Sequence, residues 1–466
     1  MKKISKRQWF NFSIWAVLYL FFSIWMENLW LLVGLIVIAD IFLTKFVTWG
    51  SWKKAKNPKV REILEWIDDI LFALIAVYII NLFVFQNYQI PTPSLEKSLM
   101  VGDYLFVSKL SYGPRVPNTP ISFPLVQNTL PILNCKSYLE WPNWGYKRVR
   151  GLGTVKRNDI VVFNFPAGDT IAINEQNPDF YNLVDRDGRA NVLANKDRYG
   201  EIVYRPVDKR ENYVKRCIGM PGDSLSVVDN QVYIDGKEAF IPENLQFNYY
   251  VETDGSVLTE EQFRMLDISK SDRNLVSTYA GYHRVLLSMG FGNDGQISLP
   301  VYHLPMTKKS LEMIQKIPTV KQVKIEPDDG GAMYPTGVSN YHTGWTRDNF
   351  GPVWIPAKGE TIRLDEKNLA IYNRCIRNYE NNTLEIKPDG TVLINGNQET
   401  SYTFKYNYYF MMGDNRHNSL DSRAWGFVPE DHIVGKPVLI WLSLDKDHGL
   451  FNGGIRWDRM FRMVHG

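Results

Sequence analysis

Residues 70–107 read ILFALIAVYIINLFVFQNYQIPTPSLEKSLMVGDYLFV, and the change of pattern within this stretch decides the fold class. From Ile70 to Phe85 the chain carries no charge and approaches the roughly 20 residues that a helix needs to cross a bilayer. From Tyr88 onward, short alternating apolar runs are separated by Gly, Pro, Asn and Asp, which is typical of antiparallel β-structure. The sequence therefore predicts a membrane helix that leads into a β domain.

Two more apolar runs precede this helix. Residues 9–26 are uncharged, and the run that begins at residue 29 is interrupted only by Asp40 before Lys45. We expect a transmembrane helical hairpin over 9–49 that turns at Glu27-Asn28, with Asp40 paired or reaching the interface near the second helix end. A cleaved secretory signal is the alternative, but no small-residue cleavage site follows the first run.

Basic residues give these spans an orientation. They gather before the first run and in a loop at 50–62, ahead of a third transmembrane helix at 63–86: Lys2, Lys3, Lys6, Arg7, Lys53, Lys54, Lys56, Lys59 and Arg61. Short loops rich in Lys and Arg stay on the cytoplasmic side. The pattern predicts a multi-pass protein of the inner or plasma membrane, with a cytoplasmic N-terminus and everything after Phe85 on the outer, periplasmic or extracellular, face.

Composition excludes several classes of protein. With Lys+Arg 53 against Asp+Glu 50 over 466 residues, the net charge of +3 gives no support to a nucleic-acid binder. Three cysteines rule out a disulfide framework or a multi-cysteine zinc scaffold, although a single bridge between Cys135 and Cys375 stays open. No histidine pair has metal-ligand spacing, so we expect neither a metal nor a cofactor.

The region after residue 87 is predicted to be mainly β. Asp-Gly at 235–236 and Asn-Gly at 395–396 follow short apolar runs, which is a hairpin signal. Thr259 and Thr307 each open a short capped helix. At the C-terminus, residues 455–464 place apolar side chains at helical spacing with arginines elsewhere on the wheel, which favours a basic amphipathic helix that lies on a membrane or packs on the β domain.

Three segments are hard to explain by structure alone. The first is Gln89 to Asp103, in which Pro91 and Pro93 hold the backbone extended around Thr92 and leave Ser94 on a short, fixed loop. A serine beside prolines is more often a simple turn residue, but this one follows a membrane span directly.

The second segment, Tyr213 to Asp223, is a strand pattern in which Lys215 and Arg216 face opposite sides. One of these two side chains must therefore lie on the more buried face. Burial disfavours the ammonium form of lysine, and a neutral lysine can act as a general base. A solvated strand lysine is the ordinary alternative.

The third segment, Met412 to Pro429, is dense in Asp, Asn and Arg. Such a loop is expected to be held together by its own hydrogen bonds and Asp–Arg pairs. It can be a purely structural loop or can support a site.

In this order, and behind membrane spans, the three segments resemble the bacterial type I signal peptidases, membrane proteases with a Ser–Lys dyad. Residues 156–166 also resemble that family's core strand. The resemblance implies a mainly β extracytoplasmic catalytic domain with antiparallel sheets, a core like that of signal peptidases and self-cleaving LexA-type repressors, an inserted second β lobe and three N-terminal transmembrane helices.

The resemblance also implies residue roles. Ser94 matches the nucleophile and Lys215 the general base. Thr92 supplies a hydroxyl that, with the Ser94 backbone N–H, stabilises the oxyanion. Ser419 orients the lysine amine, and the remaining supporting residues, Asp421 and Arg423, form an ion pair. The implied partners are the lipid bilayer and signal-peptide-bearing precursors, which are cleaved after small residues.

Four positions depart from the family pattern: Pro93, Leu95, Lys97 and His417. None of them removes a group that the chemistry needs, although Lys97 places a charge near the mouth of the site. We expect the catalytic core at 87–223 and 401–447, the inserted lobe at 224–400 and the basic tail at 448–466.

Two other functions compete with this interpretation. A self-cleaving repressor would share the Ser–Lys pairing but would lack three spans. A membrane-tethered β domain that binds or assembles exported proteins without catalysis would keep these residues only as structure.

Overall fold

The computed structural model describes residues 4–47, 50, 56–166, 170–175, 180–292, 294–331, 333–335, 343–445, 447–449 and 453–465. Residues 51–55, which hold much of the predicted basic loop, and Lys2 and Lys3 lie outside these ranges. The chain divides into two compact units, one of residues 1–86 and 108–154 and one of residues 87–107 and 155–466.

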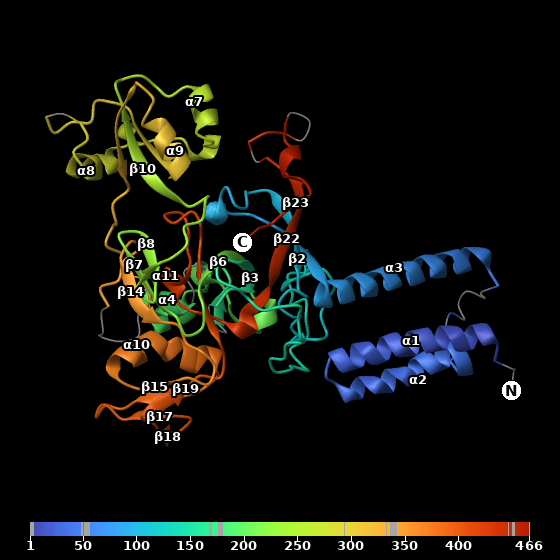
Figure 1. Ribbon diagram of the computed structural model, residues 1–466. Coiled ribbons are helices and arrows are strands. Elements are labelled where there is room, and N and C mark those ends of the chain that lie inside the picture. Colours follow the sequence, from blue (N-terminus) through green and yellow to red (C-terminus); the bar gives the residue numbers. More distant parts are fainter. Residues whose placement is uncertain are drawn as a thin grey trace. The chain divides into compact units, whose positions relative to one another are not determined.

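The first unit is built on helices (Figure 1). They are α1 (Lys6–Trp25), the 3-10 helix η1 (Leu29–Val33), α2 (Gly34–Ala39), the π-helix η2 (Asp40–Thr44) and α3 (Pro58–Phe83). The turn predicted at Glu27-Asn28 is confirmed, because α1 ends at Trp25 and Glu27 adopts a φ of 50°. The Asp40 carboxylate accepts hydrogen bonds from the backbone N–H groups of Phe46 and Val47 at 2.7 and 3.1 Å, so it is paired with the backbone just beyond the end of the second helical run.

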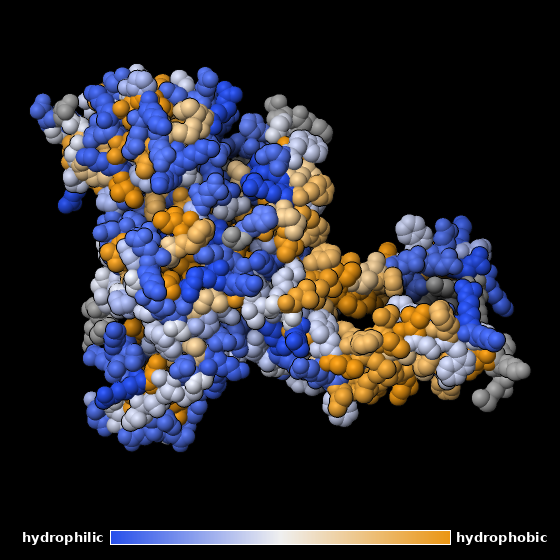
Figure 2. Space-filling view, viewed as in Figure 1, coloured by the Kyte–Doolittle hydropathy of each residue, from blue (hydrophilic) through white to orange (hydrophobic). Residues whose placement is uncertain are grey.

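Apolar side chains cover much of the surface of α1 and α3 (Figure 2). Among the described residues, however, no helix combines the length and the apolar character needed to cross a membrane. The three transmembrane helices therefore stay a prediction.

The second unit contains an eight-stranded sheet with the order β1-β2-β22-β3-β6-β20-β21, in which β23 pairs with β22. The pairings of β22 with β3, β3 with β6 and β6 with β20 are antiparallel. The strand bounds are β1 Phe85–Gln89, β2 Asp103–Ser108, β3 Ile160–Asn164, β6 Asn212–Gly219, β20 Tyr408–Met412, β21 Val428–Pro429, β22 Ile433–Ser443 and β23 Arg462–Met463. The mainly β prediction is confirmed.

The second unit also contains smaller sheets. One of them, a four-stranded sheet of order β11-β12-β10-β13, belongs to a segment that we call the β10 lobe (residues 246–325). The bounds are β4 Thr170–Ala172, β5 Ile202–Tyr204, β7 Ser224–Val228, β8 Gln231–Ile234, β9 Lys237–Glu238, β10 Gln246–Thr253, β11 Asn274–Leu275, β12 Val301–Thr307, β13 Val320–Ile325, β14 Phe350–Trp354, β15 Thr361–Arg363, β16 Leu384–Ile386, β17 Val392–Ile394, β18 Asn397–Gln398 and β19 Ser401–Thr403.

The helices of the second unit are short. They are α4 Phe180–Asp187, α5 Arg189–Ala194, α6 Lys196–Tyr199, α7 Glu260–Met265, α8 Ala280–Ser288, α9 Lys308–Ile314, α10 Glu366–Arg374 and α11 Ser422–Trp425. The helices predicted after Thr259 and Thr307 are confirmed, and each of these residues caps its helix with its own side chain. Hairpins at 235–236 and 395–396 are confirmed by the pairing of β8 with β9 and of β17 with β18.

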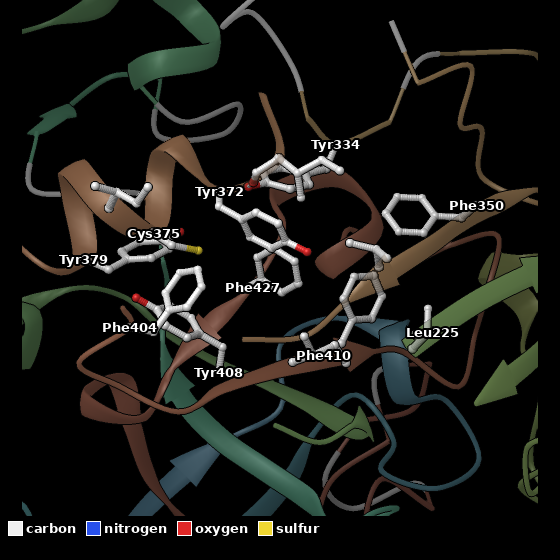
Figure 3. Packing of buried hydrophobic residues seen from close by; sticks show 14 of the residues in the cluster. Leu225, Tyr334, Phe350, Tyr372, Cys375, Tyr379, Phe404, Tyr408, Phe410 and Phe427 are labelled. Atoms are coloured by element: carbon white, nitrogen blue, oxygen red, sulfur yellow. The ribbon is translucent and has the colours of Figure 1, made fainter. Parts of the chain in front are cut away.

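An aromatic core supports one end of the main sheet. Phe410 and Tyr408 of β20 pack with Phe427 and with Tyr372 of α10 (Figure 3). The β10 lobe has separate apolar clusters of its own. Strand β20, which leads into the polar loop, is thus anchored by buried rings.

The predicted amphipathic helix at 455–464 is wrong. Residues Trp457–Arg459 form a 3-10 turn, and β23 pairs with the edge of β22. Arg459, which a helix would expose, is buried and donates to both carboxylate oxygens of Asp103, at 3.2 and 2.6 Å. Pairing with β22 and the ion pair with Asp103 therefore determine the structure of this segment, and the helical spacing of its apolar residues does not.

Candidate active site

Ser94 lies in a 3-10 turn, η4 (Pro93–Leu95), directly after β1. Pro93 suits the first position of such a turn, because its fixed φ fits and the missing N–H would have no acceptor within the turn. Leu95 is buried in an apolar cluster with Leu99, and the Leu99 N–H donates to the Leu95 carbonyl at 2.7 Å. The serine is therefore presented on a rigid support, and it is only 5% exposed.

Lys215 reaches the same place from the middle of the sheet, in β6, where it pairs with Val161 of β3. Its Nζ donates a hydrogen bond to Ser94 Oγ at 2.6 Å, and the residue is 4% exposed. Burial lowers the pKa of Lys215 to about 8, against an opposing effect of the carboxylates of Asp421 and Asp414. Because this pKa is about 8, roughly a tenth of the Lys215 side chains are uncharged at pH 7. An uncharged amine can accept a proton.

Thr92 is the exposed residue that precedes the turn. The Ser94 N–H lies in the first turn of η4, where backbone amides have no acceptor within the helix. The Thr92 side chain and the Ser94 N–H therefore belong to the same short segment as the Ser94 hydroxyl.

Asp421 and Arg423 form the expected ion pair. Arg423 Nε and Nη2 donate to the two Asp421 carboxylate oxygens at 2.9 and 2.8 Å, and the Gly413 N–H donates to Asp421 at 3.1 Å. Although burial works in the opposite direction, Arg423 holds the pKa of Asp421 below its usual value. The Ser419 Oγ is shielded from solvent and has no hydrogen-bond partner among the described residues, so the expected hydrogen bond to Lys215 is not formed.

A second buried ion pair was not predicted. On the other face of β6, Arg216 binds Asp414 of the polar loop through Nε and Nη2 at 2.8 and 2.7 Å. Ser98 Oγ donates to the same carboxylate at 2.6 Å. Strand alternation places only one of Lys215 and Arg216 on the more buried face, so it gave no signal that both would be buried or that Arg216 would need a carboxylate partner.

Asn415 completes the link between the polar loop and the turn. Its backbone N–H donates to the Ser94 carbonyl at 3.1 Å, and its Nδ2 donates to the Pro93 carbonyl at 3.3 Å. The polar loop therefore holds the backbone of the serine turn as well as the strand that carries the lysine.

His417 lies at the edge of this arrangement. Its Nδ1 accepts from the Asn248 N–H at 3.3 Å, and its Nε2 lies 3.4 Å from an Asp348 carboxylate oxygen. Burial lowers the pKa of His417, against the effect of Asp348. This departure from the family pattern is thus accommodated by contacts with β10 and with Asp348.

The three thiols are free: Cys135 is exposed, and Cys217 and Cys375 are buried. The bridge between Cys135 and Cys375 that the sequence left open is not formed. No group of three or more His, Cys, Asp or Glu side chains in the described ranges could hold a metal ion.

Comparison with known proteins gives consistent matches. The model of the family "Signal peptidase, peptidase S26" matches residues 63–277 and 355–442, well over half of the chain. Signal peptidase I of Haemophilus influenzae is 23% identical over 426 residues, which cover 90% of this chain and 80% of that protein. Signal peptidase I of Buchnera aphidicola subsp. Schizaphis graminum is 22% identical over 443 residues, 93% of each chain.

Proposed function

The chain belongs to the signal peptidase family, peptidase S26, and from this premise we propose how its residues carry out the reaction and where it takes place. The activity is that of a serine endopeptidase that removes signal peptides from precursor proteins. What the family leaves open is which groups of this chain attack, transfer protons and hold the substrate.

Ser94 is the nucleophile, and Lys215 is its general base. The observation that carries this assignment is the 2.6 Å hydrogen bond between Lys215 Nζ and Ser94 Oγ in a buried site. A serine hydroxyl needs an adjacent base to attack an amide. The neutral lysine amine takes the Ser94 proton as Oγ adds to the scissile carbonyl, and the resulting ammonium then protonates the leaving amine.

The intermediate is an ester between Ser94 and the new carboxyl end of the signal peptide. In the second half of the reaction Lys215, neutral again, removes a proton from water as the water attacks this ester. The Lys215 ammonium then returns the proton to Ser94 Oγ as the C–O bond breaks. The Thr92 hydroxyl and the Ser94 N–H stabilise the oxyanion in both halves; a single such donor is worth about 3 kcal/mol.

The polar loop supports these groups without reacting. Asp421 and Arg423 fix the loop through two-fold hydrogen bonding. The Ser419 hydroxyl, which is shielded from solvent, is the member of this loop that we propose to orient the Lys215 amine; the hydrogen bond that this role needs is not formed in this structure. The precursor binds in an extended form beside a strand edge, and cleavage follows a small residue.

Residues 9–49 and 63–86 attach the protein to the inner or plasma membrane, with the catalytic core at 87–223 and 401–447 on the outer face. The support is the uncharged runs, the nine basic residues around them and the exposed apolar side chains of α1 and α3, such as Phe21 and Phe72. The segment 224–400 is the inserted lobe and 448–466 the basic tail.

A processing assay tests the catalytic assignment. The purified full chain in detergent is expected to cut a precursor whose signal peptide ends in Ala-x-Ala, and N-terminal sequencing should place the cut after the second Ala. Ser94→Ala and Lys215→Ala should each abolish processing. The exposed-site controls Ser401→Ala and Lys237→Ala should leave it unchanged. Normal processing by either site variant would remove that residue from the mechanism.

Labelling of a native thiol tests the orientation. Cys135 is exposed and is expected outside the cytoplasm. A membrane-impermeant maleimide should label it in spheroplasts, whereas Cys135→Ser should not be labelled. Lys6→Cys in the Cys135→Ser background should react only after lysis. Labelling of Cys135 only after lysis would contradict the orientation.

A further inference from the structure

Lys97 lies three residues after Ser94 and reaches away from the catalytic core to the β10 lobe. Its Nζ lies 2.9 Å from Asp267 Oδ2 and also donates to the Asp267 backbone carbonyl. The lysine side chain is 13% exposed and that of Asp267 is 74% exposed. The ammonium is thus largely shielded and bound at two points, although its carboxylate partner is open to water.

Asp267 is a firm attachment point in the β10 lobe. It follows the C-terminus of α7, and its N–H donates to the Arg264 carbonyl at 3.1 Å. Its neighbours Leu266 and Ile268 are buried in the apolar cluster of the lobe. The partial negative charge at a helix C-terminus favours a nearby cation, so α7 and Asp267 together attract the lysine.

The backbone of the turn gives this contact a path to Ser94. Lys97 adopts a φ of 70°, which lies in the left-handed region that a lysine seldom occupies without support. The preceding Glu96 N–H donates to the Pro93 carbonyl at 2.9 Å. The following residue, Ser98, donates to Asp414 and accepts from Asn244 Nδ2 at 3.4 Å. A shift at Lys97 would therefore reach the serine turn through the Glu96–Pro93 hydrogen bond and the polar loop through Ser98.

A cavity lies beside the Lys97–Asp267 pair. Lys97 and Asp267 both line a cavity of about 470 Å³, whose other lining residues include Met100, Val101, Arg264 and Arg273. The space between the serine turn and the lobe is thus incompletely filled by packing here. The ion pair lies in the wall of this cavity and links the serine turn directly to the lobe.

We propose that the β10 lobe holds the serine turn in its reactive position through the Lys97–Asp267 pair, and that Lys97 is a positioning residue for acylation of Ser94. The inference rests on the proposed role of Ser94 as nucleophile. It gives the lobe a function in catalysis that is distinct from binding a precursor, since Lys97 would act through the turn and not through a contact with the substrate.

The test compares Lys97→Met, Asp267→Asn and the double variant with the wild type, using the full chain and an internally quenched signal-peptide substrate. We expect each single variant to lower kcat about tenfold with KM changed less than about twofold, because small misplacements of reacting groups have effects of this order or larger. The double variant should be no slower than Lys97→Met, and Lys97→Arg should recover most of the activity.

Two controls make the outcome decisive. Glu260→Gln breaks an ion pair with Arg273 within the same lobe and should leave kcat unchanged. Thermal unfolding of all variants should stay within a few degrees of the wild type. An inactive wild type would refute the proposed function itself. Wild-type kcat in Lys97→Met, or a KM effect that follows the charge of the substrate's mature segment, would overturn the positioning role alone.

Discussion

The buried Lys215 amine makes a quantitative prediction for the pH dependence of cleavage. Its pKa is lowered from 10.5 to about 8, so the neutral fraction at pH 7 is about 10%, against about 0.03% for an unperturbed lysine. That difference of roughly 300-fold is the net effect of burial and of the neighbouring charges on the amount of active base, equivalent to about 3 kcal/mol. We expect kcat/KM to rise about tenfold per pH unit below pH 7 and to level off above the pKa.

The assay is a pH profile of kcat/KM with the quenched peptide from about pH 5.5 to 10.5. Removing the charge of Asp421, which raises the pKa of Lys215, should move the inflection of Asp421→Asn to lower pH. The exposed-site control Asp458→Asn should keep the wild-type inflection. An inflection near 10.5, or one that Asp421→Asn leaves in place, would refute the reasoning about burial and charge.

Further predictions concern stability and packing. Replacing Lys215 by Met should stabilise the fold by about 2–3 kcal/mol below pH 8, because a buried ammonium is removed. The pKa of this lysine is about 8 in the folded state and 10.5 when unperturbed, so the gain should disappear between these two values as the pH rises. Thermal unfolding at a series of pH values measures this loss. Gly413→Ala places a Cβ 2.6 Å from the Ser94 carbonyl and should lower kcat/KM at least about tenfold, whereas Gly281→Ala, with nothing within 4 Å of the new Cβ, should not; equal activity of the two variants would contradict this. Asp414→Asn leaves its buried arginine partner without a carboxylate and should destabilise the protein by about 3–5 kcal/mol in urea unfolding, and a change under about 1 kcal/mol would show that the pair is not a structural support.

Local patterns predicted much of the second unit. The short apolar runs at 103–107 and 160–164 and the turn residues at 235–236 predicted two strands and a hairpin that the structure contains. Helix α10 was missed although Asp365 caps it, because its apolar positions lie between strand-like runs. The tail failed for a different reason, since its partners lie outside the window that shows the helical period: Arg459 binds Asp103, 356 residues away, and β23 pairs with β22.

In the site, likewise, residues in local motifs were predicted and some contacts between distant segments were not. Ser94 and Lys215 were predicted from motifs that resemble a family, and the structure brings them within hydrogen-bonding distance. The bond between Arg216 and Asp414, which are 198 residues apart, could not be predicted from either segment alone. Likewise, the contact of Lys97 with Asp267 depends on how the β10 lobe folds back on the serine turn.

Intact-mass and peptide-mapping measurements on an acid-quenched reaction test the central claim most directly. Quenching during turnover should trap an ester whose added mass equals that of the cleaved signal peptide less one water, on the fragment that contains Ser94. Lys215→Ala should form no such adduct although it still binds the precursor, because no base takes the serine proton. An adduct on another residue, or one formed at the wild-type rate in Lys215→Ala, would contradict the account.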